Sequence, residues 1–257
     1  MSLDALKADA NLLRLNEGTL VNTAGSFTNP LGFYTGTNYA SDRTAHTPTA
    51  SDYGTPPGNA PGQSFKTDGS VWVTHDSQSN GGVVVGHTVL CWVKGVALTG
   101  GDQGLFCYSN TGDAQGDSYL QVRVNSTGEL SLVVRDGSFN DIDSGVTPDW
   151  TQWHLVGVSI DSSTSSTLWL DGANAATITR PSSNPGFLRV LALGALARNG
   201  TTGNLATAEF YGPWVFDRVL TESEVATIYN AYMSDDSPGI ASPVSRSITQ
   251  PITRSLA

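Results

Sequence analysis

The fold is decided by WHLVGVSID, Trp153 to Asp161, and by STLWLDG, Ser166 to Gly172. Both stretches are rich in β-branched, aliphatic and aromatic residues, which favour strands. Each stretch ends on a polar turn signal, and Asp171-Gly172 is a pair typical of a tight turn between strands. The two stretches therefore predict neighbouring antiparallel strands, with His154 as a structural hydrogen-bonding group at a strand end.

Further strand-like runs lie on the N-terminal side of this pair. They are SVWVTH (70–75), VVVGHTVLCWVKG (83–95), GLFCYSN (104–110), SYLQVRVN (118–125) and ELSLVVRDG (129–137). Asn125 to Gly128 separates two of them and predicts a hairpin. Short strands at intervals of about ten residues without intervening helices are typical of two packed antiparallel sheets. We therefore predict an all-β sandwich.

Three other segments complete the predicted organisation. SDRTAHTPTASDYGTPPGNAPGQ (41–63) has no hydrophobic period and predicts a long surface loop. Thr221 to Met233 predicts one short helix at the sandwich edge, capped by Thr221 with Glu224 three residues later. We expect a sandwich domain over residues 1–234 and an extended arm over 235–257.

The expected arm contains a short repeat, because PVSRSITQ (243–250) is echoed by PITRSLA (251–257). Proline at this spacing excludes a helix and a central strand. The residues that recur in the repeat predict a partner-docking arm, with a disordered end as the alternative. They are Val244, Arg246, Ile248, Ile252, Arg254 and Leu256.

The composition limits the partners. The 257 residues carry 23 Asp and Glu against 13 Lys and Arg, a formal net charge of −10 that repels phosphate backbones and anionic lipids. No apolar run reaches the roughly 20 residues of a membrane-spanning helix. The first ten residues, MSLDALKADA, lack a signal-peptide pattern. We therefore expect no nucleic-acid or membrane partner and a protein made in a cytoplasm.

The sequence is compatible with two oxidation states of its two cysteines. If Cys91 and Cys107 stand on neighbouring strands of one hairpin, their sulfurs face each other. They are then a pair of buried thiols or one cross-strand disulfide.

Several segments in a fixed order resemble laminin-G-like domains of the concanavalin A-like lectin and glucanase superfamily. These are QSFKTDG with VWV (63–73), TVLCWVK (88–94), WHLVGVSID with LWLDG (153–172), and EFYGPWVFDRVLT (209–221). The likeness covers approximately residues 11–232. It implies a concanavalin A-like, jelly-roll sandwich of two antiparallel sheets, closed by a short helix.

Some relatives in this superfamily are glucanases, which the resemblance makes a remote alternative. Their pattern places Glu, Asp and Glu at alternate positions of one strand, and no Glu of this chain stands in such a strand. Asp141 and Asp143 have the spacing that retaining chemistry needs. They follow DGSFN, which we interpret as a loop, so we expect no enzyme activity.

Two kinds of binding site remain. The first is a carbohydrate site, in which aromatic rings stack on sugars and polar groups bind hydroxyls. Its candidate residues are Tyr108, Tyr119, Phe139, Asn140 and Asp141. The second is a calcium site, which the resemblance suggests and Asp-rich loops permit. Its candidate ligands are Asp113, Asp117, Asp141 and Asp143.

Two functions follow. The first is a structural protein of a tailed phage, a capsid decoration or fibre-type module that docks through its arm on virion subunits. We then expect a homo-oligomer, favouring a trimer, located in the virion after synthesis in the host cytoplasm. The alternative is a carbohydrate-binding lectin module of a bacterial protein that recognises a surface glycan.

Overall fold

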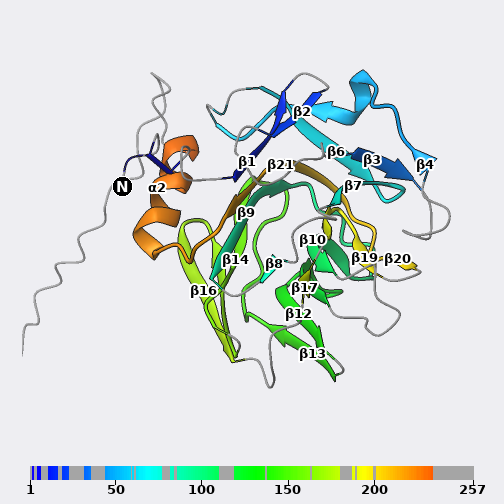
Figure 1. Ribbon diagram of the computed structural model, residues 1–257. Coiled ribbons are helices and arrows are strands. Elements are labelled where there is room, and N and C mark those ends of the chain that lie inside the picture. The colour runs from blue at the N-terminus through cyan, green and yellow to red at the C-terminus, as the bar shows by residue number, and fades with distance from the viewer. Residues whose placement is uncertain are drawn as a thin grey trace, which may run out of the picture.

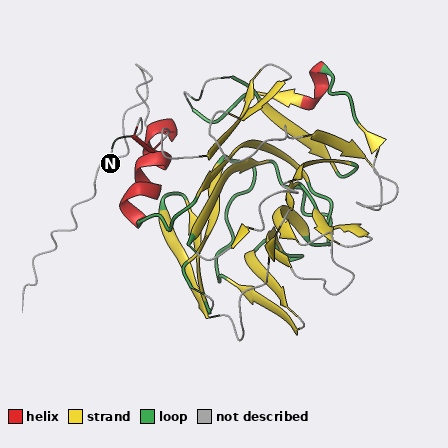
Figure 2. Cartoon of the chain, viewed as in Figure 1, coloured by secondary structure: helices red, strands yellow, loops and turns green. Residues whose placement is uncertain are grey.

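The computed structural model describes residues 2–233, except 3–4, 7–10, 17–18, 23–31, 36–43, 59, 61, 77–81, 84–85, 110–118, 137, 163, 180–186, 189 and 199–200. Two large sheets pack face to face, and every strand pairing in them is antiparallel (Figure 1). Strands dominate the described residues, as Figure 2 shows. The predicted two-sheet sandwich is confirmed.

The first sheet has nine strands. Its main path is β16 (Ala173–Thr179), β15 (Ser165–Leu170), β14 (His154–Ile160), β9 (His87–Lys94), β21 (Thr207–Phe216), β1 (Asn11–Asn16) and β2 (Thr19–Asn22). β6 (Ser64–Asp68) pairs with the first half of β21, and β5 (Tyr53–Gly54) pairs with β6.

The second sheet has eight strands. In order they are β13 (Ser138–Asp143), β12 (Leu130–Asp136), β11 (Tyr119–Val124), β10 (Gln103–Ser109), β18 (Val190–Leu193), β7 (Val71–Asp76), β3 (Gly32–Thr35) and β4 (Thr44–Ala45). Two small pairs accompany it, β8 (Gly82–Val83) with β17 (Phe187–Leu188), and β19 (Leu196–Arg198) with β20 (Thr201–Gly203).

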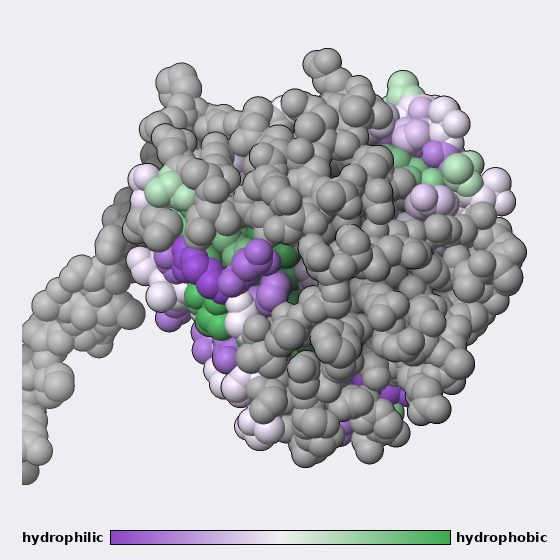
Figure 3. Space-filling model, viewed as in Figure 1, coloured by the Kyte–Doolittle hydropathy of each residue, from purple (hydrophilic) through white to green (hydrophobic). Residues whose placement is uncertain are grey.

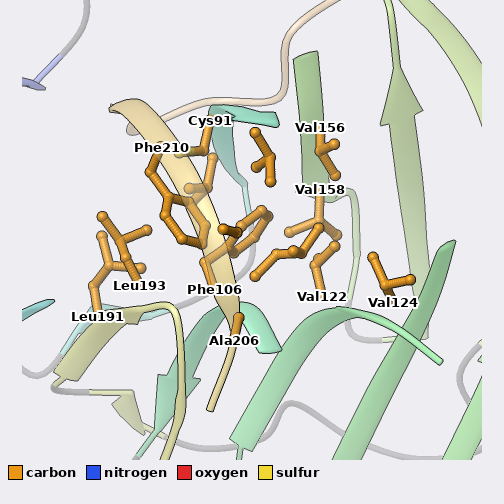
Figure 4. Packing of buried hydrophobic residues seen from close by; sticks show 14 of the residues in the cluster. Cys91, Phe106, Val122, Val124, Val156, Val158, Leu191, Leu193, Ala206 and Phe210 are labelled. Atoms are coloured by element: carbon orange, nitrogen blue, oxygen red, sulfur yellow. The ribbon is translucent and has the colours of Figure 1, made fainter. Parts of the chain in front are cut away.

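The main core fills the space between the sheets. Phe106 and Val122 of the second sheet face Val158 and Phe210 of the first, and all four are fully buried (Figure 4). Apolar residues at alternate positions of each strand supply this layer, because neighbouring side chains point to opposite faces. Burial of such side chains contributes about 1.5–3 kcal/mol each.

The predicted hairpin at Asn125 to Gly128 is confirmed. β11 and β12 pair from Tyr119↔Arg135 to Val124↔Leu130 around it. Asn125 Oδ1 accepts hydrogen bonds from the backbone nitrogens of Thr127 and Glu129. The interpretation of the segment after Asp136 as a loop is wrong, because Ser138–Asp143 forms the edge strand β13.

The two cysteines lie in different sheets, so the hairpin that would place them opposite each other does not form. Cys91 stands on β9 and packs between the sheets, whereas Cys107 stands on β10 and faces the outer side of the second sheet. Both are buried and no disulfide links them. Burial raises the pKa of the Cys91 thiol far above its usual range.

The helix α2 (Glu222–Met233) covers the outer face of the nine-stranded sheet rather than its edge (Figure 1). Val225, Ile228 and Tyr232 are buried there against Leu90 and Trp92 of β9. In the space-filling view, hydrophilic and hydrophobic side chains of the described residues lie next to one another beside this helix (Figure 3).

The predicted capping box of this helix is confirmed. Thr221 N and Thr221 Oγ1 donate to Glu224 Oε2 at 2.9 and 3.0 Å, and Glu224 N donates to Thr221 Oγ1 at 3.4 Å. Arg218 donates to both carboxylate oxygens of Glu224 at 2.9 Å. Arg218 is the main reason that the pKa of Glu224 is lowered to about 2.

His154 has a structural position at the start of β14. Its Nδ1 lies 2.8 Å from Asp171 Oδ2, and its Nε2 lies 2.8 Å from the carbonyl oxygen of Asp149. Burial by itself lowers the pKa of His154, but the hydrogen bonds to Asp171 and Asp149 outweigh it and raise the pKa overall. The ring therefore joins the turn after β15 to the loop before β14.

Other predicted segments have mixed outcomes. The stretch 41–63 contains β4, β5 and the short 3-10 helix η1 (Ala50–Asp52) within its described part. The arm residues Val244, Arg246, Ile248, Ile252, Arg254 and Leu256 lie outside the described residues, and the division at residue 234 stays a prediction. In the described part of the chain, none of the helices combines the length and hydropathy required to cross a bilayer.

Candidate functional site

The candidate site lies on the outer face of the eight-stranded sheet, where β11, β12 and the edge strand β13 run side by side. Three cross-strand rows of residues face outward there. Tyr119 pairs with Arg135 and Arg135 with Phe139; Gln121 pairs with Val133 and Val133 with Asp141; Arg123 pairs with Ser131 and Ser131 with Asp143. Directly opposed side chains on one face lie within about 4.5–5.5 Å at Cβ, so each row is a continuous strip.

Phe139 is the exposed aromatic residue of this surface. It is 57% exposed, and it is the only aromatic residue among the described ones that falls in the exposed class. Its ring stands beside Arg135 and two residues from Asp141 on the same face. An exposed apolar ring on a strand is a stacking surface for a flat apolar ligand face.

The structure separates the other predicted carbohydrate-binding residues. Tyr119 shares the outer face with Phe139, but it is only 3% exposed. Tyr108 packs against the core between the sheets, and Asn140 lies opposite Val134, whose side chain also points into that core. Of the predicted carbohydrate-binding residues, Phe139 and Asp141 are thus the two that are exposed and share the outer face of the sheet.

Arg123 organises the polar part of the site. It is 6% exposed, and each of its three nitrogens donates to a protein oxygen. Nε donates to Ser131 Oγ at 3.1 Å, Nη1 to Asp102 Oδ2 and Nη2 to Asp141 Oδ2. A buried guanidinium requires such partners, because an unpaired charge in the interior is strongly destabilising.

The two carboxylates of this network keep one oxygen each for other partners. Within the described residues, the Oδ1 atoms of Asp102 and Asp141 make no hydrogen bond. Burial raises the pKa of Asp141 and is the largest influence on it. Arg123 lowers this pKa, but the net shift of the pKa is upward. The site therefore presents hydrogen-bond acceptors next to the Phe139 ring.

Some buried polar atoms on the same face find no hydrogen-bond partner within the described residues. They include Gln121 Nε2 and Ser109 Oγ, and both residues are fully buried. Gln121 Oε1 accepts from Asn204 Nδ2 at 3.1 Å. A Cβ on residue 104 would lie 2.5 Å from Gln121 Nε2, so the glycine at this position leaves room for the glutamine side chain.

The carboxylates Asp141 and Asp143 stand at alternate positions of a strand, a placement that can provide the separation of roughly 5 Å that retaining chemistry needs. Their partners differ from those of a catalytic pair. Asp141 is bound by Arg123, and Asp143 Oδ1 accepts from Asn125 Nδ2 at 2.9 Å. Each carboxylate is therefore paired with a different protein donor.

The predicted calcium ligands are not brought together by the described residues. Asp113 and Asp117 lie outside them, Asp141 is paired with Arg123 and Asp143 with Asn125. The described part of the chain contains no group of three or more His, Cys, Asp or Glu side chains that could hold a metal ion. The calcium site stays a prediction.

Sequence reasoning missed Arg123, Arg135 and Asp102 as members of the site. Arg123 and Arg135 carry a weak signal, because each interrupts an apolar strand at an outward-facing position of the period-two pattern. Asp102 carries none, since a loop residue 21 positions from Arg123 reaches it only through the folded sheet.

A family model described as "Concanavalin A-like lectin/glucanases superfamily" matches residues 65–226. No curated protein matches the sequence. The match spans the strands from β6 to β21 and the beginning of α2, and so includes all of the outward-facing rows described above.

Solved structures with the same fold have low sequence identity. Domain 4 of AbnA, a GH43 extracellular arabinanase from Geobacillus stearothermophilus, in complex with arabinotriose, is 15% identical with a TM-score of 0.63. The alignment covers 86% of this chain and 99% of that domain. At this identity the likeness concerns the fold alone.

Toxin binding domains have the fold as well. That of Paraclostridial Mosquitocidal Protein 1 is 15% identical with a TM-score of 0.62, over 88% of this chain and 53% of that one. The binding domain of Botulinum Neurotoxin DC in complex with SialylT is 10% identical with a TM-score of 0.61, over 88% and 52%. This chain spans about half the length of these toxin domains.

Proposed function

Because the chain belongs to the concanavalin A-like lectin/glucanases superfamily, we propose that it is a non-catalytic carbohydrate-binding module. The observation that carries the proposal is the exposed ring of Phe139 beside Asp141 on one face of the sheet. A sugar ring offers an apolar face to the aromatic ring and hydroxyl groups to the carboxylate oxygens. Few but well-placed polar groups next to an apolar surface are typical of small-ligand sites.

The solved relatives support the same kind of ligand. The arabinanase domain is in complex with arabinotriose, and the neurotoxin binding domain is in complex with SialylT. For this chain we propose binding without turnover, because Asp141 and Asp143 are occupied by Arg123 and Asn125. Release of reducing ends from a bound oligosaccharide would contradict the non-catalytic part of the proposal.

Replacing Phe139 by Ala tests the proposed site. We expect the variant to bind its oligosaccharide about tenfold more weakly, a loss of about 1.4 kcal/mol, because the stacking surface is removed. Stability should change by no more than about 0.5 kcal/mol, since the side chain is exposed. A glycan array identifies the ligand, and titration calorimetry measures the affinity.

The matched controls are Val219→Ala and Met233→Ala, which trim other exposed apolar side chains of the chain. Both should leave glycan binding unchanged. Equal binding by Phe139→Ala and the two controls would exclude the outer face of β13 as the site.

We propose a phage virion role as the second candidate function, supported by the repeat in residues 243–257. In this proposal the arm adds backbone to a sheet edge of a neighbouring subunit, and the particle contains several copies. Deletion of residues 240–257 should then reduce the native mass to that of a monomer while glycan binding persists. An unchanged native mass would argue against arm-mediated assembly.

A further inference from the structure

We infer that the outer-face site selects uncharged oligosaccharides over acidic ones, such as uronate or sialylated chains. This inference rests on the proposed carbohydrate-binding function and specifies its ligand class.

The carboxylates of the site outnumber its cations. The described outward-facing residues and their partners include three carboxylates and two guanidinium groups. The carboxylates are those of Asp102, Asp141 and Asp143, and the guanidinium groups are those of Arg123 and Arg135. Asp141 and Asp143 are both exposed. At neutral pH these carboxylates repel the carboxylate of an acidic sugar, and the net charge of −10 adds to this repulsion.

Arg123 is poorly placed to bind an acidic sugar. It is 6% exposed, and its charge is matched by two protein carboxylates. Its role is that of a positioning residue, because it fixes Asp102 and Asp141 through one oxygen of each. The second oxygens are thereby held in place as acceptors for hydroxyl groups.

The remaining polar groups also suit hydroxyls. The hydroxyl groups of a neutral sugar donate hydrogen bonds to the Oδ1 atoms of Asp102 and Asp141 while one face of the sugar packs on Phe139. Among the described outward-facing residues, Arg135 is the second cation of this surface. It stands next to Phe139 in the outward-facing row and is therefore the residue through which an acidic ligand would bind if the inference were wrong.

Matched pairs of probes test the inference on the whole 257-residue chain. Galactotriose is compared with trigalacturonate, and lactose with sialyllactose, by titration calorimetry at low ionic strength. We expect the neutral member of a pair to bind at least tenfold more tightly than its acidic counterpart. Tighter or equal binding of the acidic members would overturn the inference but leave the carbohydrate-binding function standing.

Two variants make the result specific to the carboxylates. Asp141→Asn should weaken neutral binding by about tenfold and reduce the preference against acidic probes, whereas Glu222→Gln removes an equal charge from the far helix α2 and should change neither. Thermal unfolding shows whether Asp141→Asn keeps the fold. An unchanged preference for neutral probes in folded Asp141→Asn would overturn the inference, and so would acidic binding that disappears in Arg135→Gln. Absence of any carbohydrate binding across a full glycan array would overturn the proposed function itself.

Discussion

The Gly157→Ala variant should unfold at a much lower denaturant concentration than the wild type. Gly157 lies in the middle of β14, opposite Leu90 of β9 and Trp169 of β15. A Cβ at this position would lie 2.3 Å from Leu90 Cδ2 and 2.5 Å from the carbonyl oxygen of Val89. The side chain of Leu90 can move, but the backbone oxygen is fixed in the sheet.

We expect the free energy of unfolding to fall by about 3 kcal/mol, the upper part of the range for overpacked sites. Urea unfolding followed by tryptophan fluorescence measures it. Gly203→Ala is the matched control, because a Cβ there meets no atom of the described residues within 4 Å. Equal stability of both variants would show that β9 and β14 approach each other less closely than described.

The Trp92→Ala variant should lose a similar or larger part of the stability. Trp92 is 1% exposed, and its ring centroid lies 5.6 Å from that of Tyr229 and 6.1 Å from that of Tyr232. Truncation of a buried tryptophan costs about 3–5 kcal/mol. Here it also removes the main aromatic contact between β9 and α2.

Trp153→Ala provides the comparison, because Trp153 is only partly buried at the rim of the same cluster. We expect it to cost clearly less than Trp92→Ala. Urea unfolding gives both free energies, and near-ultraviolet circular dichroism reports the loss of aromatic packing around α2. A Trp92→Ala variant within about 1 kcal/mol of the wild type would contradict this description of the cluster.

The sequence predicts the sandwich well because the period-two pattern is strong. The alternation in SYLQVRV and ELSLVV places Val122 and Leu132 inward and Gln121 and Ser131 outward, and the turn at Asn125 to Gly128 fixes the register between them. Thr221 and Glu224 likewise mark the start of α2 through a local interaction that sequence spacing reveals.

Sequence reasoning fails where the outcome depends on contacts between distant segments. SFNDID, 138–143, has polar residues at most positions, and its strand conformation follows from pairing with β12 rather than from its own pattern. The same limitation applies to Cys91 and Cys107, because local pattern does not say to which sheet a strand belongs. The cluster of Asp102, Arg123 and Asp141 is another such case.

The placement of the two thiols gives the protein a pair of internal probes. A maleimide can reach Cys91 only after the two layers separate, whereas Cys107 becomes accessible when the opposite side of the second sheet is uncovered. The relative labelling rates of the two sulfurs would therefore distinguish opening of the sandwich from local exposure of one of its faces.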